Sequence, residues 1–393
     1  TSVTTIISVE AALTRVPLKT VTSLSSRVVS NREYVLVRVT DDAGNTGIGF
    51  CYAGHRSGQL VQRAALDLLA PVVLGQQTWR TTGLWADMYQ EGLLHGRTGS
   101  VMRALSCIDI ALWDLNARKA GMPLYQYLGA DAVDRVPAYA SGGYYIDGKG
   151  PKELADEVRG YVEAGFKAVK IKVGKYGVAE EAARVKAARE AIGEHVPLML
   201  DANNAWSDLR TAELHCKAYE PYNPEWIEEP FIPDDIDNHR RLGNLTSIPI
   251  ATGEIETGRW RLKELLDQDN ITILQHDACV CGGITEWRRM TDTAASYGMT
   301  VNPHWFHDIH VHLVASSTSA KYVEFFTDEM VLNFRELIDT QLQFEDGDVL
   351  LPKTSGLGFN FDEDQVAKYA AFEAGVTDVW DKVSATPSQI AAQ

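Results

Sequence analysis

Cysteine is scarce in this sequence, and the few thiols follow no pattern that would form a disulfide framework or a metal site. The 393 residues include five cysteines, odd in number and scattered: Cys51, Cys107, Cys216, Cys279 and Cys281. One residue separates Cys279 from Cys281, which is not the spacing of C-x-x-C metal or redox motifs. Disulfides belong to oxidising compartments. We therefore expect reduced thiols and a cytoplasmic protein.

Basic residues and long apolar runs are also in short supply. Lysine plus arginine number 37 against 53 aspartate plus glutamate, a net charge of -16, which argues against a nucleic acid or an anionic membrane as partner. No apolar run approaches membrane-spanning length, and the first residues lack the basic-then-apolar pattern of a secretion signal. With 45% hydrophobic and 23% charged residues, the composition is that of a soluble globular protein. The length predicts two or three domains.

The segment from Ala168 to Gly174 reads as a short buried strand that two lysines interrupt. Side chains two apart on a strand share a face, so Lys170 and Lys172 must point the same way. Neighbouring ammonium groups disfavour each other's charge, and burial adds to this. We therefore expect one of the two lysines to lose its proton easily and to serve as a base. The alternative is an edge strand whose lysines reach water.

The first third of the chain predicts a separate α+β unit. Residues 41–45, Asp-Asp-Ala-Gly-Asn, lie between two strand-like runs and have the composition of a hairpin turn. Residues 19–30 and 52–58 read as flexible loops, which often carry specificity. From residue 59 to about 119 the apolar spacing is helical. We place the end of this unit near residue 130.

Short apolar runs alternate with helical segments over the rest of the chain. Eight runs are recognisable, at residues 136–141, 168–173, 198–203, 226–229, 250–254, 271–277, 300–304 and 322–325. Eight strands with seven intervening helices predict an α/β fold, a (β/α)₈ barrel of the TIM type. We place the barrel at residues 131–360. The remaining residues, 361–393, are expected to form a C-terminal segment.

Acidic residues end three consecutive strand runs. Asp201 ends the run at 198–203, Glu228 and Glu229 end the next, and Glu254 ends the one after. The active sites of barrel enzymes gather at the C-terminal ends of the strands, where three carboxylates would repel each other without a cation. Oxygen ligands favour Mg²⁺ over zinc. A single acidic strand end is more often a helix cap or part of an ion pair, but three in succession predict a metal site.

Asp277 and His304 end neighbouring runs on the other side of the predicted mouth. A carboxylate beside an imidazole can orient it and tune its proton affinity, so the two residues predict an acid/base dyad facing the lysines. Glu324 places a carboxyl group in the last strand. A zinc site is the alternative for His304, because three further histidines follow closely: His307, His310 and His312.

These residues, taken in order, resemble the mandelate racemase subgroup of the enolase superfamily. The resemblance covers nearly the whole chain and rests on these motifs: Lys170-x-Lys172, Asp201-x-Asn203, Glu228-Glu229-Pro230, Gly253-Glu254, His276-Asp277, His304 and Glu324. It implies that the N-terminal unit caps the barrel mouth, with specificity loops at about 19–30 and 52–58, and that residues 361–393 pack back on this cap. It also implies a homo-oligomer and a small carboxylate substrate.

The resemblance also implies a role for each residue. Asp201, Glu228 and Glu254 would bind Mg²⁺, and Lys172 would be a base. Lys170 would support it and contact the substrate carboxylate, Asp277 with His304 would form the second acid/base group, and a protonated Glu324 would hydrogen-bond the developing enediolate. Three carboxylates, one Mg²⁺ and one charged lysine sum to zero formal charge, so the site could accept an anion. Electrostatic preorganisation of this kind is usually the largest catalytic term.

The motifs shared by the whole subgroup do not distinguish between the reactions that can follow enediolate formation. The segments around Lys170, Glu254 and His304 are more similar to the acid-sugar dehydratases of the subgroup, especially those acting on galactarate or talarate, so we expect dehydration to a 2-keto-3-deoxy acid. The alternatives are a racemase, epimerase or cycloisomerase, and an inactive barrel that binds sugar acids. Candidate substrate contacts are Asn203, Ser141, Tyr52, His55 and Arg56.

Overall fold

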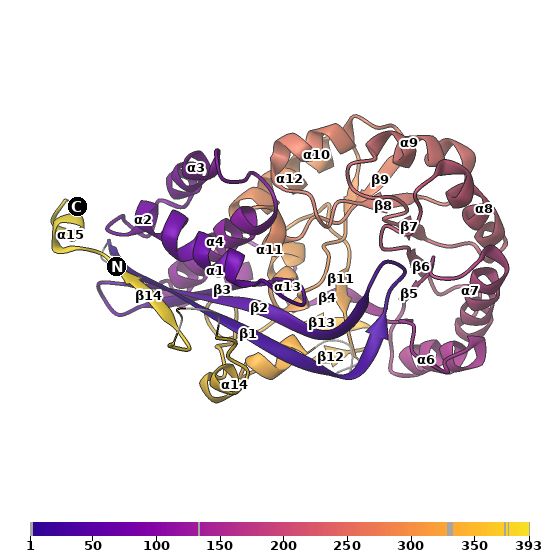
Figure 1. Ribbon diagram of the computed structural model, residues 1–393, viewed down its shortest axis with the longest axis horizontal. Coiled ribbons are helices and arrows are strands. Elements are labelled where there is room, and N and C mark those ends of the chain that lie inside the picture. Colours follow the sequence, from indigo (N-terminus) through magenta and orange to yellow (C-terminus); the bar gives the residue numbers. More distant parts are fainter. Residues whose placement is uncertain (1–2, 133, 328–332, 373–374, 376, 393) are drawn as a thin grey trace.

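The computed structural model describes residues 3–132, 134–327, 333–372, 375 and 377–392. It consists of an antiparallel sheet with helices, called the cap below, beside a barrel of parallel strands (Figure 1). The predicted fold class, an α/β barrel with an N-terminal α+β cap, is confirmed. Among the described residues, no helix combines the length and apolar character that crossing a bilayer requires.

The cap sheet has four antiparallel strands in the order β14-β1-β2-β3. Their bounds are β1 Ile6–Ser23, β2 Val28–Asp41, β3 Thr46–Tyr52 and β14 Asp381–Ser384. The predicted turn joins β2 to β3, where the Asp41 carboxylate accepts hydrogen bonds from the backbone N–H groups of Ala43 and Asn45. Near the other end of the chain, β14 pairs with β1, so the C-terminal segment completes the sheet.

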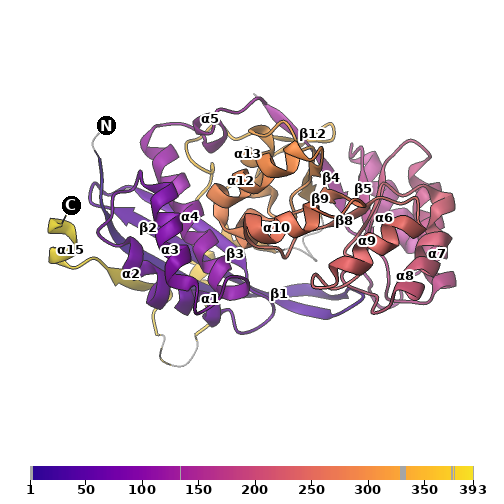
Figure 2. The same ribbon diagram turned by 90° about the horizontal axis from the view of Figure 1, so that it is seen from above.

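The prediction of a flexible loop at residues 19–30 is wrong. Strand β1 continues to Ser23 and β2 begins at Val28, which leaves four residues to turn the chain. Both views of the ribbon show this long hairpin reaching from the cap to the barrel (Figures 1 and 2). There the Ser23 N–H donates to the Tyr145 carbonyl at 2.9 Å, and the Ser25 hydroxyl donates to the Ala202 carbonyl at 2.5 Å. The β-branched residues of this segment favour a strand, and the barrel supplies hydrogen-bond partners for the tip of the hairpin.

The helices of the cap follow β3, and the longest of them packs against the sheet. They are α1 Gln59–Arg63, the π-helix η1 Ala64–Leu69, α2 Ala70–Val73, α3 Thr81–Gly92, α4 Gly99–Lys119 and α5 Leu124–Tyr127. The longest, α4, contacts β3 at two glycines, Gly47 and Gly49. A Cβ at either position would lie 1.9 Å from a carbonyl oxygen of α4. Glycine is therefore required there for the helix to pack this closely.

The eight predicted runs form the barrel strands. Their bounds are β4 Arg135–Ser141, β5 Val169–Lys172, β6 Leu198–Asp201, β7 Trp226–Glu228, β8 Ile250–Thr252, β9 Ile271–Leu274, β10 Thr300–Val301 and β11 Val323–Phe325. Neighbours pair in parallel from β4 to β10, and β11 pairs with β4. A parallel bridge between Val301 and Ala320 links β10 to the segment before β11, so the ring closes.

Helices connect the strands and cover the outside of the barrel. They are α6 Pro151–Glu163, α7 Val178–Ile192, α8 Leu209–Tyr219, the 3-10 helix η2 Glu220–Tyr222, α9 Ile236–Leu245, α10 Gly258–Leu266, α11 Ala278–Cys281, α12 Gly283–Ser296 and α13 His307–Ala315. After the barrel follow η3 Phe334–Leu337, β12 Phe344–Glu345, β13 Asp348–Leu350, α14 Glu363–Lys368 and α15 Pro387–Ala391. Strand β13 pairs antiparallel with β4.

The inside of the barrel is layered, because side chains two apart on a strand point the same way. The lower layer is mostly apolar and contains Tyr139, Ala168, Met199, Trp226, Ala251 and Ile273. The next layer lies two residues further along each chain segment. It contains Ser141, Lys170, Asp201, Glu228 and Gln275, together with Glu324, which lies two residues after Tyr322 of the lower layer. The polar layer therefore rests on an apolar floor at the C-terminal ends of the strands.

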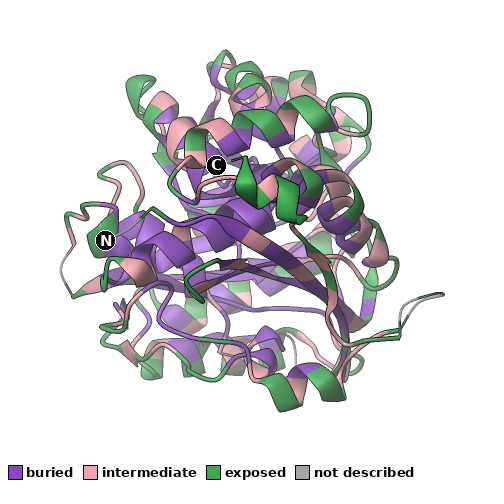
Figure 3. Cartoon of the chain, turned by 90° about the vertical axis from the view of Figure 1, so that its left-hand side faces the viewer, coloured by how far each residue is buried: buried purple, intermediate pink, exposed green. Residues whose placement is uncertain are grey.

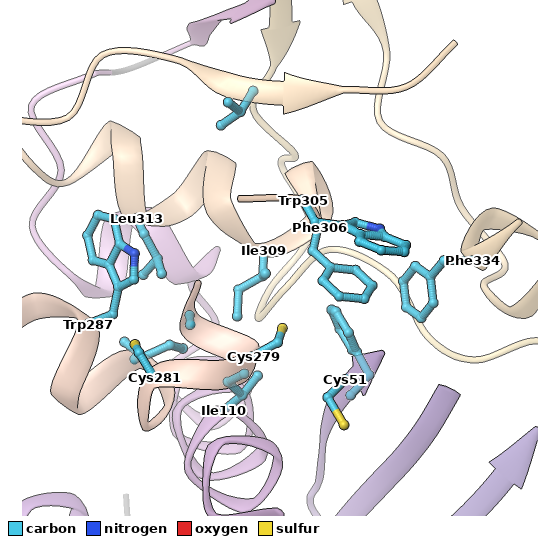
Figure 4. Close-up of a cluster of buried hydrophobic side chains, with 14 of the residues drawn as sticks. Cys51, Ile110, Cys279, Cys281, Trp287, Trp305, Phe306, Ile309, Leu313 and Phe334 are labelled. Atoms are coloured by element: carbon cyan, nitrogen blue, oxygen red, sulfur yellow. The ribbon is translucent and has the colours of Figure 1, made fainter. Parts of the chain in front are cut away.

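Aromatic residues fill the contact between cap and barrel. Phe306 lies 5.2 Å from Phe50 of β3 and 5.1 Å from Phe334, measured between ring centroids. Figure 4 shows Trp305 and Phe306 at the start of α13, beside Phe334 and near Cys51 of the cap. Buried residues are concentrated in the middle of the molecule and exposed ones on the peripheral helices (Figure 3). The two units thus share one hydrophobic core.

Candidate active site

Three carboxylates from successive strand ends meet at the top of the barrel. Asp201 ends β6, Glu228 ends β7, and Glu254 follows β8. One oxygen from each lies within 4.8 Å of the others. The structure therefore brings together the three acids that the sequence predicted to share a site.

The two lysines of β5 lie at different depths. Lys172 lines a cavity at the barrel mouth, and its Nζ is 2.7 Å from Asp201 Oδ2. Lys170 is only 1% exposed and is not among the residues lining the cavity. Its Nζ lies 2.8 Å from Glu228 Oε2 and 2.7 Å from Glu324 Oε2. The expectation that Lys170 contacts the substrate carboxylate is therefore not supported.

Nearby carboxylates oppose the predicted easy loss of a proton from one of the two lysines. Burial lowers the pKa of both amines, but the nearby carboxylates outweigh it, chiefly Glu228 for Lys170 and Asp201 for Lys172. The pKa of each lysine is therefore raised. A neighbouring opposite charge favours the charged form, and the sequence could not show that each amine has its own carboxylate partner.

Glu324 is held as a carboxylate. Burial alone would raise its pKa, but the nearby cations, chiefly Lys170 with His304 and Lys172, together outweigh burial and lower the pKa to about 2. Its Oε2 accepts a hydrogen bond from the Ser141 hydroxyl at 2.7 Å, and its Oε1 accepts one from the Trp305 N–H at 2.8 Å. Among the protein's own groups, Lys170 thus opposes the expected protonation of Glu324. Ser141, predicted to bind substrate, instead contacts Glu324 and does not line the cavity at the barrel mouth.

His304 lies between two carboxylates. Its Nδ1 is 3.0 Å from Asp277 Oδ2, and its Nε2 is 3.0 Å from Glu254 Oε2. Burial lowers the pKa of His304, but Glu254 and Asp277 outweigh it and raise the pKa to about 9. The structure therefore forms the predicted Asp277–His304 pair and adds a contact from His304 to the carboxylate triad.

This pKa predicts a pH-dependent stability. A histidine whose pKa rises from 6.5 to about 9 on folding stabilises the protein fully below 6.5 and loses that effect as pH rises through 9. In chelator-treated protein, we expect the stability advantage of wild type over His304→Asn to shrink by about 3 kcal/mol between about pH 6 and pH 10. Urea unfolding at both pH values measures it. Equal advantages would contradict the assignment.

The cavity at the barrel mouth has a volume of about 120 Å³. Its lining includes Lys172, His304, Asp277, Glu324 and two triad members, Asp201 and Glu254. Lys172 contacts Asp201, and His304 contacts Glu254. The two candidate acid/base groups therefore contact different acids of the triad, and both line the same cavity.

The predicted substrate contacts divide into two groups. Asn203 and Tyr52 line the cavity, and Asn203 Oδ1 is buried without a hydrogen-bond partner. His55 and Arg56 are exposed and do not line it. Their loop follows β3, and both side chains lie outside the cavity.

Sequence reasoning missed the arginines of the cavity. Arg32 of β2, Arg103 of α4 and Arg27 of the hairpin turn all line it. Arg32 is 4% exposed, and its guanidinium lies over the rings of Tyr52 and Trp305, at 5.3 and 4.8 Å from their centroids. A basic residue at a buried strand position is a usable signal for Arg32. No such signal marks Arg103 or Arg27 in the sequence, because only the docking of the cap on the barrel brings them to the cavity.

The triad fits a hard divalent cation. All its donors are oxygens, the set that Mg²⁺ prefers, and Glu254 Oε1 is buried without a hydrogen-bond partner. Burial and the neighbouring Asp201 raise the pKa of Glu228 to about 8. The positive charge of the surrounding protein groups is therefore too small to keep all three acids ionised at neutral pH. The zinc alternative finds no support, because both ring nitrogens of His310 and of His312 contact backbone groups.

Comparison with known proteins identifies both parts of the chain. Residues 3–129 match the family described as mandelate racemase / muconate lactonizing enzyme, N-terminal domain. Residues 153–365 match the family described as enolase C-terminal domain-like. Both matches agree with the resemblance seen in the sequence.

Individual relatives carry several activities. L-talarate/galactarate dehydratase of Salmonella typhimurium is 33% identical, over 90% of this chain and 88% of its own length. The 3,6-anhydro-alpha-L-galactonate cycloisomerase of Streptomyces coelicolor is also 33% identical, over 80% of this chain and 87% of its own. The crystal structure of a racemase from Streptomyces coelicolor with bound magnesium superposes with a TM-score of 0.86 at 30% identity, covering 93% and 100% of the two chains.

The strand-end carboxylates, the lysine pair and the histidine dyad thus occur in a chain that these comparisons match over nearly its full length. This chain belongs to the mandelate racemase/muconate lactonizing enzyme group of the enolase superfamily.

Proposed function

We propose that the chain removes the proton next to the carboxylate of a sugar acid and then expels the neighbouring hydroxyl as water, giving a 2-keto-3-deoxy acid. One observation carries this proposal: Lys172 and His304 open onto the same cavity and contact different members of the Asp201–Glu228–Glu254 triad. Such an elimination needs a base for the α-proton and an acid for the leaving hydroxyl.

Asp201, Glu228 and Glu254 would hold Mg²⁺. When bound, Mg²⁺ would offset the negative charge of these acids, including the charge that raises the pKa of Lys172, and would stabilise charge developing on the substrate carboxylate. An oxygen-only donor set and the unpartnered Glu254 Oε1 support this assignment.

The protein's own groups would carry the protons. Lys172 Nζ accepts the α-proton, and the electron pair of the broken C–H bond moves into the carboxylate as an enediolate. Lys170, held between Glu228 and Glu324, supplies a buried positive charge near this anion. His304 then donates a proton to the β-hydroxyl as the C–O bond breaks, so water leaves. The enol product tautomerises to the 2-keto acid.

His304 is better suited to be the acid of this step than a first base. Asp277 and Glu254 on its two ring nitrogens favour the imidazolium form. Hydrogen bonds at Nδ1 also fix which nitrogen faces the cavity. If a proton returned to the α-carbon from His304 instead, the enzyme would be a racemase or epimerase, and the same geometry permits that outcome.

The arginines favour a substrate with two carboxylates. Arg27, Arg32 and Arg103 come from the cap, whereas the triad comes from the barrel. A diacid could place one carboxylate at each end of the cavity, and the amide of Asn203 could bind a hydroxyl between them. A charge-assisted hydrogen bond contributes about 1.5–3 kcal/mol, so diacids should exceed matched monoacids by about tenfold or more in kcat/KM.

Incubation with Mg²⁺ in D₂O tests the proposal on paired hexaric and hexonic acids. We expect deuterium at the α-carbon by NMR, a positive colour test for 2-keto-3-deoxy acids, and faster turnover of diacids. Exchange without keto acid would indicate a racemase or epimerase, and turnover of an added sugar-acid lactone but not of the open-chain acids would indicate a cycloisomerase. Absence of both exchange and product across the panel would contradict enediolate chemistry.

A further inference from the structure

His310 connects the two segments that carry the acid/base dyad. It lies on α13, is 0% exposed, and uses both ring nitrogens. Nδ1 is 2.8 Å from the Trp305 carbonyl oxygen, and Nε2 accepts a hydrogen bond from the Ala278 N–H at 3.1 Å. A carbonyl can only accept and a backbone N–H can only donate. These partners therefore select the neutral tautomer with its proton on Nδ1.

The two partners of His310 are the direct neighbours of the dyad. Ala278 follows Asp277, and Trp305 follows His304. The dyad contact, Asp277 Oδ2 to His304 Nδ1 at 3.0 Å, closes a ring of contacts that runs through His310. Any displacement of His310 would therefore change the separation of the segments that hold the carboxylate and the imidazole.

The backbone after His304 needs such support. Trp305 and Phe306 have φ angles of 57° and 30°, a left-handed conformation that costs non-glycine residues free energy and persists only where neighbouring contacts hold it. The Trp305 N–H donates to Glu324 Oε1, and the Trp305 carbonyl accepts from His310. His310 thus anchors one side of a strained turn whose preceding residue is His304.

We propose that His310 is a positioning residue that sets the geometry of the Asp277–His304 dyad and so controls proton delivery by His304. This inference rests on the proposed function for its kinetic readout. It predicts that loss of His310 impairs the step assigned to His304 more than the step assigned to Lys172, because Lys172 lies on β5 and has Asp201 as its own partner.

His312 provides a matched control on the same helix. It is also 0% exposed, accepts a hydrogen bond from the Tyr125 N–H at 3.1 Å, and lies 2.9 Å from the Leu357 carbonyl oxygen. Its two hydrogen bonds to backbone groups therefore match those of His310 in kind, and it lacks only the approach of His310 Nε2 to Asp277 Oδ1 at 3.5 Å. They link α13 to α5 and to the segment around Leu357, away from the dyad.

The experiment compares His310→Asn with His312→Asn by the ratio of α-deuterium exchange to keto-acid formation in D₂O. A small misplacement of a reacting group can cost about 10²-fold. For His310→Asn we expect product formation to fall about 10–100-fold with KM little changed, and the exchange-to-product ratio to rise about tenfold. His312→Asn should lose comparable thermal stability and keep the wild-type ratio. The same ratio in both variants would overturn the proposal.

NMR of histidine-labelled protein tests the positioning without turnover. A downfield Nδ1–H signal from His304, assigned by its loss in His304→Asn, is expected in wild type and in His312→Asn and is expected to be lost or shifted in His310→Asn. An unchanged signal in His310→Asn would overturn the inference. A wild type that turns over no substrate would contradict only the proposed function, and the NMR comparison would still test the inference. If His310→Asn does not fold, His310→Gln serves instead, because its side chain can still reach Ala278.

Discussion

Replacing Lys172 with methionine is expected to lower both α-proton exchange and keto-acid formation by about 10³-fold or more, since a positioned general base contributes about 10²–10⁴-fold. Methionine keeps a flexible apolar stem of similar length and lacks the amine. Lys172 Nζ lies at the cavity, 2.7 Å from Asp201. No other lysine lines this cavity among the residues that the structure describes.

Lys175→Met is the matched control for this substitution. Lys175 lies three residues further along the chain, and its Nζ bonds to the Ser23 hydroxyl rather than to the triad. It should retain exchange close to the wild-type rate in the NMR assay. Substantial exchange in Lys172→Met would assign the base to another group, and an equal loss in both variants would indicate general damage to the mouth.

Removal of divalent cations is expected to abolish exchange and product formation, and Mg²⁺ should restore both. The triad carries three acids within 4.8 Å, and the pKa of Glu228 is raised to about 8 by burial and by Asp201. A cation that binds only the folded state stabilises it by about 2.7 kcal/mol at a hundred times its dissociation constant. Thermal unfolding with and without Mg²⁺ therefore measures binding independently of activity.

Glu228→Gln and Glu256→Gln separate a metal ligand from an ordinary buried acid. Glu228→Gln should remove most of the Mg²⁺-induced stabilisation together with activity. Glu256 is also buried, but it is paired with Arg261 at 3.3 Å outside the triad, so Glu256→Gln should keep both responses. Full activity in chelated protein that metal analysis finds free of divalent ions would contradict the assignment.

Strand periodicity explains why so much of the site was predictable. Asp201 and Glu228 end strands that pair in parallel, in register, so their proximity follows once a barrel is assumed. The same alternation places Lys170 and Lys172 on one face. His304 and Asp277 were found in the same way, because each follows a neighbouring strand. These are local patterns repeated along the chain, and short-range backbone geometry determines them.

The partners of these groups were not predictable in this way. Lys170 turned out to lie below the cavity between Glu228 and Glu324, which raises its pKa and keeps Glu324 ionised. The distances from an amine to carboxylates on three other strands depend on barrel closure and side-chain packing. Two lysines spaced along one strand cannot show these distances.

By itself, the sequence determined the barrel, its cap, the three strand-end acids and the dyad, because each depends on hydrophobic periodicity and on residues at strand ends. Only the tertiary structure decided which side chains reach the substrate cavity. It brought in Arg32 and Arg103 and left His55 and Arg56 in solvent. The physical reason is that the cavity wall is made by contacts between residues far apart in the chain, such as Ser25 with Ala202, and no local pattern encodes how the hairpin docks on the barrel.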